Sequence, residues 1–317
     1  MLKNIIKFVK FINYLRLKNY KKNFKRLLKK NKIVFIDIGA AIQIIPRWKR
    51  IDKSNLKYIL FEPNPNEFKK LNLNRKYYNQ YKAYNFALSD KNKILKLYIT
   101  KGIYQSSVLK PNFNLTSQFL NPERYSIIGK ELLNAKKLDY FKIDNADFIK
   151  IDTQGYNYQI LNGAAKTLKN TIGIETEVEF TQVYTKQKLF GDISSYLKKK
   201  NFDFIDFTTL KRWNRSNEQN YGECIFGNAL FLKKPEEILK LNENKIIKYI
   251  AICILYNQYE LVDYILKKKK ISKKKILKIN NNIKFFKSYS NKSKFLKKIF
   301  STLNKIIDFE SEIHIFQ

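Results

Sequence analysis

The sequence has very little of the residues on which several common kinds of catalytic and metal site depend. Its 317 residues include two cysteines, Cys224 and Cys253, and a single histidine, His314. Two cysteines are too few for a disulfide framework or a cysteine-rich zinc site. A Ser-His-Asp hydrolase, a Cys-His protease and a His-ligated metal site all need an imidazole placed within a fold. The sequence therefore argues against all of these classes.

Long apolar runs are also missing. No stretch reaches the roughly 18 uncharged apolar residues that a membrane span needs, and the longest candidate is 249–256. Near the N-terminus, Lys3, Lys7 and Lys10 interrupt any apolar core of a signal peptide. We therefore expect a cytoplasmic protein whose contact with a membrane, if it makes one, is peripheral and at the inner face.

Acidic residues are scarce relative to basic ones. The 27 Asp and Glu stand against 63 Lys and Arg, which gives a formal net charge of +36. One interpretation is a partner with many negative charges, such as nucleic acid or an anionic membrane. The other is a general bias of the sequence toward Lys, Asn and Ile, and composition leaves both open. Hydrophobic residues at 44% and aromatic residues at 15% exclude a mainly disordered chain.

Three segments of the chain differ in their patterning. Residues 1–31 contain eleven Lys or Arg and no acid, with apolar residues at helical spacing, which predicts a basic amphipathic helix. Its apolar face suits either a membrane interface or packing on the neighbouring domain. Residues 32–233 have the patterning of a folded domain. Residues 234–317 begin with Pro235 and two glutamates, as helices do, and predict a basic, mainly helical extension.

The central segment alternates short apolar runs with helix-like stretches. The runs predict strands at 32–39, 58–61, 94–99, 148–151, 173–180, 202–207 and 228–232. The stretches predict helices at 67–73, 158–168 and 192–200. Strands that alternate with helices indicate an α/β fold with a parallel or mixed sheet covered on both faces.

The turn after the first predicted strand has the features of a nucleotide-binding turn. Asp37, Gly39 and Ala40 leave the strand, and Glu62 ends the next strand 23 residues beyond Gly39. Small residues allow the backbone to approach a nucleotide, and an acid at that spacing accepts hydrogen bonds from ribose hydroxyls. The full GxGxxG of a dinucleotide site is absent. A cofactor without phosphate, such as S-adenosylmethionine, fits this turn better.

Further motifs follow in order, and together they resemble the FkbM family of S-adenosylmethionine-dependent methyltransferases. The segments that carry the resemblance are 35–40, Arg47-Trp48, 61–65, 87–90, 149–156, 160–164, 177–180 and Leu189-Phe190. The resemblance covers about 32–233. Its most specific part is 152–164, with the pattern Asp-x-x-Gly-Tyr-x-x-x-x-Leu-x-Gly-Ala.

The resemblance implies a Rossmann-like class I methyltransferase fold with a seven-stranded, mostly parallel sheet. It also implies methyl transfer to an oxygen of a saccharide, glycan or natural-product acceptor. By matching motif positions, the residues implied to bind S-adenosylmethionine are Asp37, Gly39, Ala40, Glu62, Leu88, Ser89 and Asp90. Asp152 would lie beside the reacting methyl group. In this family a second small residue commonly follows the Gly-Ala pair, whereas this sequence continues with the bulky Ile42 and Gln43. This departure leaves a catalytically inactive binding module of the same fold as an alternative.

A carboxylate is the expected proton acceptor. Methyl transfer from a sulfonium requires an aligned acceptor and removal of its proton, and without a usable histidine a carboxylate, Lys or Tyr must serve as base. Asp152 is the first choice, because catalytic groups gather at the carboxyl ends of parallel strands. Glu177 and Glu179 match the family's Glu-Val-Glu-Phe and are predicted to bind the acceptor or to act as base. They share one face of a strand with Glu175, so that face is either solvated or borders the cleft. No metal-ligand set has a convincing spacing, and we predict no metal.

An RNA methyltransferase that holds nucleic acid with its basic ends is the second alternative. The aromatic residues are spread along the chain, which favours core packing over base stacking, and the signature of paired sheet aromatics is absent. A saccharide is therefore favoured over nucleic acid as the partner. Arg47-Trp48 and Ser106-Ser107 also match recurring family positions, but no role follows from the residues themselves.

Overall fold

The computed structural model describes residues 2–40, 46–73, 80–217 and 221–268, together with Lys284 and Phe286. The chain divides into two compact units. The sheet unit comprises 33–43 and 56–234, and the terminal unit comprises 1–32, 44–55 and 235–317. The domain boundaries predicted after residues 31 and 233 stay predictions.

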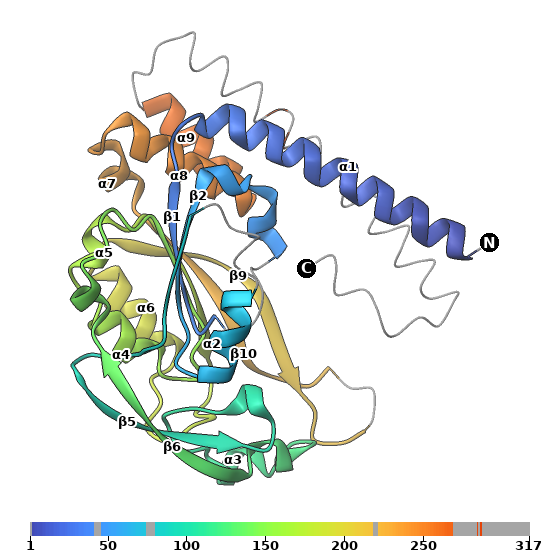
Figure 1. The fold of residues 1–317 in the computed structure, drawn as a ribbon, viewed down its shortest axis with the longest axis vertical. Coiled ribbons are helices and arrows are strands. Elements are labelled where there is room, and N and C mark those ends of the chain that lie inside the picture. The colour runs from blue at the N-terminus through green and yellow to red at the C-terminus, as the bar shows by residue number, and fades with distance from the viewer. Residues whose placement is uncertain are drawn as a thin grey trace. The chain divides into compact units, whose positions relative to one another are not determined.

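Within the described part of the sheet unit, seven strands form one mostly parallel sheet, as predicted (Figure 1). Its strand order is β3-β2-β1-β7-β8-β10-β9. The strands are β1 (Ile33–Ile38), β2 (Leu56–Phe61), β3 (Tyr81–Tyr84), β7 (Phe148–Ile151), β8 (Gly173–Glu179), β9 (Phe202–Trp213) and β10 (Glu223–Lys233). Only β10 runs antiparallel to its neighbours, β8 and β9.

The central strands are buried along their whole length. Every residue of β1 and every residue of β8 is buried, as expected for parallel strands covered on both faces. Ile36, Ile149 and Ile174 lie in the same core cluster, which joins β1, β7 and β8. The few carboxylates on these strands therefore sit in places where burial is costly unless something compensates for it.

Helices α4 (Asn157–Asn162), α5 (Thr167–Asn170) and α6 (Phe190–Lys198) lie together on one face of the sheet (Figure 1). Helix α2 (Pro65–Leu73) follows β2. The single helix predicted at 158–168 is wrong, because the chain forms two short helices there. The carboxylate of Asp139 accepts hydrogen bonds from the backbone N–H groups of Lys166 and Thr167, each at 2.8 Å, and so caps a new helix start.

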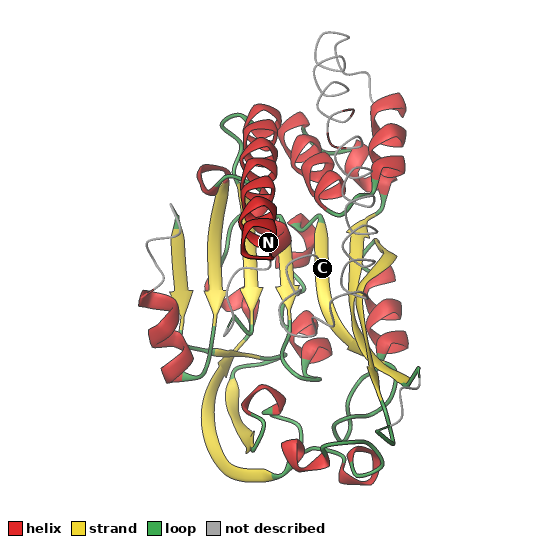
Figure 2. Cartoon of the chain, turned by 90° about the vertical axis from the view of Figure 1, so that its right-hand side faces the viewer, coloured by secondary structure: helices red, strands yellow, loops and turns green. Residues whose placement is uncertain are grey.

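A smaller sheet lies beyond the carboxyl ends of the parallel strands (Figure 2). It consists of β4 (Ala87–Leu88), β6 (Ile127–Lys136) and β5 (Lys93–Thr100), in that order. The strand predicted at 94–99 therefore belongs to this sheet and not to the main one, while β3 and β6 were not predicted. Short helices surround it: η4 (Ile103–Gln105), α3 (Phe113–Thr116), η5 (Pro122–Tyr125) and η6 (Leu138–Phe141).

The terminal unit is helical in its described residues. Its elements are α1 (Leu2–Leu28), η1 (Pro46–Arg50), η2 (Lys53–Asn55), α7 (Pro235–Leu239), α8 (Glu243–Leu255) and α9 (Tyr259–Lys268). Trp48 is fully buried and donates a hydrogen bond from Nε1 to the Tyr256 hydroxyl at 3.1 Å, which is a packing role. Of the apolar stripe predicted on α1, the described side chain Leu15 is exposed. None of the helices in the described ranges is both long and apolar enough to cross a membrane.

Candidate active site at the carboxyl ends of the central strands

The turn after β1 brings three of the predicted cofactor-binding residues together. Asp37 is buried within β1, and the N–H groups of Gly39 and Ala40 donate to the carbonyl of Phe61 at the end of β2, at 3.0 and 3.2 Å. Gly39 has φ +77°, and a Cβ there would overlap the carbonyl oxygen of Asp152. Glycine is therefore required for this turn to approach the residue that follows β7. The bulky Ile42 and Gln43 lie outside the described residues.

A partly buried lysine on β7 joins two of the predicted site carboxylates. Nζ of Lys150 lies 3.3 Å from Oδ1 of Asp37 and 3.6 Å from Oδ2 of Asp152. Burial by itself lowers the pKa of Lys150, but the negative charges of Asp37 and Asp152 outweigh it and raise this pKa. Burial raises the pKa of Asp37, against the opposing charge of Lys150. Oδ1 of Asp37 is buried and accepts no hydrogen bond from the described residues.

Glu62 follows β2 directly and is also buried, with 5% of its surface exposed. Its Oε1 accepts a hydrogen bond from the Asn64 N–H at 2.8 Å. The side chain of Asn85, after β3, donates to the carbonyls of Glu62 and Pro63 at 2.9 Å and so fixes this turn. Burial raises the pKa of Glu62 to about 7. A carboxyl group held in this way has capacity left to accept ribose hydroxyls.

The predicted adenine-side residues form a third turn. Leu88 and Ser89 are buried, and the Ser89 hydroxyl donates to Oδ1 of Asp90 at 2.8 Å and lies 3.0 Å from the Tyr156 hydroxyl. A Cβ at Gly163 would overlap the backbone carbonyl of Ser89. The Gly-Tyr and Gly-Ala parts of the most specific motif therefore support the turn that contains Ser89.

The predicted catalytic carboxylates meet around Gln154. Nε2 of Gln154 donates to Oδ1 of Asp152 and to Oε1 of Glu177, both at 3.2 Å, while its Oε1 accepts from the Tyr184 hydroxyl at 3.0 Å. Asp152 keeps 33% of its side chain exposed, whereas Glu177 and Glu179 are 7% and 3% exposed. The partly exposed carboxylate is thus the one that an incoming molecule can reach.

Glu177 and Glu179 behave as a proton-holding pair. Burial raises the pKa of Glu179 to about 8 and raises the pKa of Glu177 well above its usual range. The charge of Asp152 adds to both shifts, and each of the two carboxyl groups also affects the pKa of the other. Glu175 shares their strand face but accepts a hydrogen bond from the Thr208 hydroxyl at 2.6 Å. All three glutamates are buried, so their shared face is not solvated.

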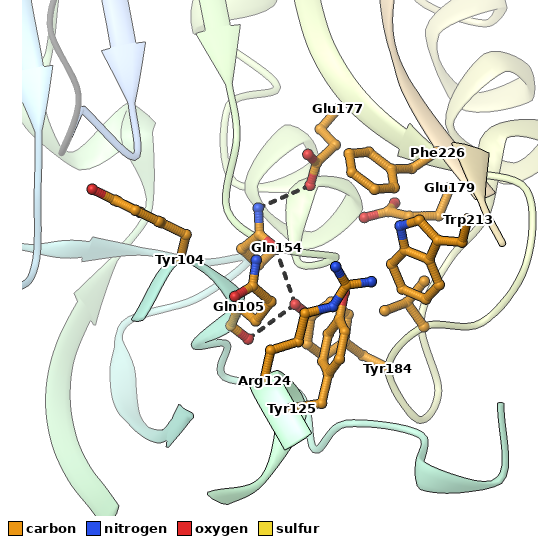
Figure 3. Close-up of a pocket in the computed structure, with 11 residues that line it drawn as sticks. Tyr104, Gln105, Arg124, Tyr125, Gln154, Glu177, Glu179, Tyr184, Trp213 and Phe226 are labelled. Carbon is orange, nitrogen blue, oxygen red and sulfur yellow. Dashed lines mark hydrogen bonds between the residues drawn. The ribbon is translucent and has the colours of Figure 1, made fainter. Parts of the chain in front are cut away.

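An aromatic pocket of about 130 Å³ adjoins the carboxylate pair (Figure 3). Its lining residues come from the loops around the small sheet, from the turn after β7 and from strands β8 to β10. They are Tyr104, Gln105, Arg124, Tyr125, Gln154, Glu177, Glu179, Val183, Tyr184, Trp213 and Phe226. Among the described residues, no group of three or more His, Cys, Asp or Glu side chains is arranged to hold a metal ion.

The structure brings the predicted residues into one region along the carboxyl ends of β1, β2, β7 and β8, and it adds others that the sequence analysis did not assign. Gln154 lies inside the most specific motif and Lys150 lies two residues before it, and their closeness to Asp152 in the sequence was a signal. Three others have no motif around them: Arg124 comes from η5, Tyr184 from the loop after β8, and Trp213 from the end of β9. Ser107 has a role after all, because its hydroxyl donates to the carbonyl of Gln154 at 2.6 Å.

Comparison with known proteins identifies the class. The model of the methyltransferase FkbM domain family matches residues 37–204, more than half of the chain. The chain therefore belongs to the FkbM family of S-adenosylmethionine-dependent methyltransferases. This confirms the predicted family, the enzyme class and the cofactor.

Several solved structures are similar to the chain. FkbM methyltransferase from Methylobacillus flagellatus KT is 13% identical, with a TM-score of 0.39, and the match covers 63% of this chain but only 43% of that one. Precorrin-6y C5,15-methyltransferase from Geobacter metallireducens GS-15 is 9% identical (TM-score 0.34, 68% of this chain and 87% of that one). TrmK from M. capricolum, solved with S-adenosylhomocysteine, is 10% identical (TM-score 0.30, 84% and 95%). All of these identities and TM-scores are low, and no curated protein matched the chain.

Proposed function

We propose that this protein transfers a methyl group from S-adenosylmethionine to a hydroxyl of a saccharide, glycan or related natural-product acceptor. The observation that carries the proposal is the placement of Asp152. Its partly exposed carboxylate lies between the glycine turn after β1 and an aromatic pocket that contains two further carboxyl groups. This arrangement supports a base at the point where a cofactor cleft and an acceptor pocket would meet.

The residues around the β1 and β2 turns fit the cofactor. The buried Oδ1 of Asp37 has Lys150 at 3.3 Å but no well-aligned hydrogen bond, and it suits the amino group of the methionine part. Glu62 suits the ribose hydroxyls, and the turn at Ser89 and Asp90 suits the adenine side. When bound, S-adenosylmethionine supplies a methyl group on a positively charged sulfur that an oxygen can attack.

Asp152 is proposed as the base. Its carboxylate would accept the proton of the acceptor hydroxyl as that oxygen bonds to the methyl carbon and the carbon–sulfur bond breaks to leave a neutral thioether. Gln154 and Lys150 hold the carboxylate in place through contacts at 3.2 and 3.6 Å. The raised pKa of Lys150 keeps its ammonium group charged, so it cannot itself take up the proton at neutral pH. Glu177 and Glu179 are proposed to hydrogen-bond other oxygens of the acceptor.

Aromatic rings and carboxyl groups support a saccharide as the acceptor. Sugar rings present apolar C–H faces that pack on aromatic rings, and hydroxyls that pair with carboxyl groups. Tyr125, Trp213 and Phe226 supply rings to the pocket, and Glu177 and Glu179 supply the polar groups.

Calorimetric titration with S-adenosylhomocysteine tests the cofactor site. We expect binding on the order of micromolar for the wild type, and Glu62→Ala to weaken it by at least about tenfold, because the ribose loses its acceptor. Glu67→Ala is the matched control, since Glu67 is a nearby acid in a surface ion pair with Lys70. A folded wild-type protein that does not bind would overturn the proposal and favour the inactive binding module.

Asp152→Ala separates chemistry from binding. With a panel of saccharides and radiolabelled S-adenosylmethionine, we expect this variant to bind S-adenosylhomocysteine as the wild type does but to lose turnover. Undiminished turnover would refute Asp152 as the base. Label that enters RNA instead of sugars would favour the RNA methyltransferase.

A cytoplasmic location with peripheral contact to an anionic membrane is proposed for the whole chain. Its support is the absence of acidic residues from 1–31, where eleven are basic. Co-sedimentation with anionic but not with neutral vesicles is expected, and equal behaviour with both would contradict the contact.

A further inference from the structure

Arg124 occupies the middle of the aromatic pocket. It belongs to η5, and Figure 3 draws its guanidinium group among the other lining side chains. The guanidinium carbon lies 4.6 Å from the ring centroid of Trp213 and 5.3 Å from that of Tyr125. These are cation–π distances, so the two rings hold the positive charge in a fixed place.

This arginine has no polar partner among the described residues. No hydrogen bond or ion pair of that part of the chain involves its side chain, and its Nε is buried without an acceptor. Two exposed arginines nearby differ: Arg212 donates to the carbonyl of Gly222 at 3.0 Å, and Arg215 pairs with Glu223 at 2.6 Å. The residue is half-buried, and its buried Nε–H without an acceptor is costly, so a ligand that supplies an acceptor removes that cost.

The acids in the same pocket do not serve as its counter-ions. Glu177 and Glu179 interact with each other, and Glu177 also accepts from Gln154. Burial raises the pKa of both carboxyl groups, that of Glu179 to about 8, which disfavours their charged forms, and neither is in an ion pair with Arg124. The pocket therefore presents hydroxyl-binding carboxyl groups together with an uncompensated positive charge of Arg124.

The size of the pocket limits what it can hold. A volume of about 130 Å³ accommodates a few water-sized groups, which suits one end of a sugar and not a whole oligosaccharide. The planar fork of a guanidinium group matches carboxylate and phosphate oxygens. We infer that this pocket binds the anionic group of the acceptor, so that the substrate is an acidic saccharide, a uronate or a phosphorylated sugar, with Arg124 as its counter-charge. This inference rests on the proposed function.

Calorimetry on the full chain saturated with S-adenosylhomocysteine tests the inference. The probes are D-glucuronate, its neutral methyl ester, glucose 6-phosphate and glucose. We expect at least one acid to bind at least about tenfold more tightly than both neutral sugars, as one charge-assisted contact allows. A preference for glucuronate assigns a uronate, and a preference for glucose 6-phosphate assigns a phosphorylated sugar.

Arg124→Gln should bring acidic and neutral probes to within about twofold of each other, and Arg124→Lys should keep part of the preference. Arg212→Gln, which removes an exposed arginine stacked on Tyr221, should leave the preference intact. Melting curves show which variants fold. If Arg124→Gln does not fold, the comparison of glucuronate with its methyl ester on the wild type still tests the inference.

Equal affinity for glucuronate and its ester, a preference that survives in Arg124→Gln, or binding of none of the four sugars would each overturn the inference. Because every titration begins with protein shown to bind S-adenosylhomocysteine, such a failure leaves the proposed cofactor site standing. Loss of cofactor binding in the wild type would instead be a failure of the proposed function.

Discussion

Gln154 shows how a single residue can organise the site. Its φ of +52° is unusual for a residue other than glycine, and Gly155 after it has φ +89°. This backbone turns the Gln154 amide so that one nitrogen serves both Asp152 and Glu177, while Tyr184 fixes the amide oxygen. A neutral donor between two carboxyl groups reduces their mutual repulsion without adding a charge.

Glu179→Gln tests the role of the buried carboxyl pair. The pKa of Glu179 is raised to about 8, so this carboxyl is protonated below that pH and ionises above it. We expect kcat/KM of the wild type to fall above about pH 8, when the new charge appears beside Asp152. Glutamine keeps a hydrogen-bond donor and cannot ionise. The variant should therefore stay within about threefold of the wild type at pH 7 and lose the alkaline fall.

Steady-state kinetics across pH measure this, with Glu223→Gln as a control because Glu223 is an exposed acid outside the pocket. Complete loss of activity at pH 7 in Glu179→Gln would make Glu179, and not Asp152, the better candidate for the base.

At the scale of elements, the turn that contains Ser89 depends on a glycine in another segment. Gly163 has φ −73°, an ordinary conformation, yet a Cβ there would overlap the Ser89 carbonyl. Gly163→Ala should therefore destabilise the protein by about 1–3 kcal/mol through overpacking. It should also weaken S-adenosylhomocysteine binding, because the Ser89 turn must move. Thermal unfolding and calorimetry measure the two effects.

Gly191→Ala is the matched control for this prediction. Gly191 lies in the first turn of α6, and a Cβ there would contact nothing within 4 Å. The substitution should be neutral or stabilise by up to about 1 kcal/mol. If Gly163→Ala and Gly191→Ala had the same effect on stability and binding, the close contact between Gly163 and Ser89 would not explain why the motif has a glycine there.

The elements also show what the sequence could and could not predict. Strand β7 was predicted at its observed bounds because Phe148, Ile149 and Ile151 form a short buried apolar run that only Lys150 interrupts. Strand β6 was missed, because Ile128 and Leu132 are 67% exposed and disturb the alternation on which prediction depends. The motif residues Asp37, Glu62 and Asp152 were predicted because each lies at or near the end of a predicted strand. Arg124 could not be found, since its position depends on a loop that folds against Trp213.

At the scale of the whole molecule, the unusual composition leaves few groups that titrate near neutral pH. The sequence has 63 Lys and Arg and a single histidine, so almost no ordinary group titrates between about pH 6 and pH 9. The exceptions in the sheet unit are buried carboxyl groups. The pKa of Glu62 is about 7 and that of Glu179 about 8, and the pKa values of Glu177 and Asp37 are also raised.

These raised pKa values predict how the stability of the protein without cofactor depends on pH. The folded protein keeps protons that the unfolded chain releases above about pH 4.5, so the stabilising contribution is present at low pH and is lost as the pH rises through 7 and 8. We expect the Tm to fall by at least about 3 °C between about pH 6 and pH 9 at constant ionic strength. The fall should be much smaller in the double variant Glu62→Gln, Glu179→Gln. Because almost no other group titrates in this range, the net charge of the rest of the chain changes little between these pH values, so a flat or rising Tm would mean that the buried carboxyl groups are already ionised.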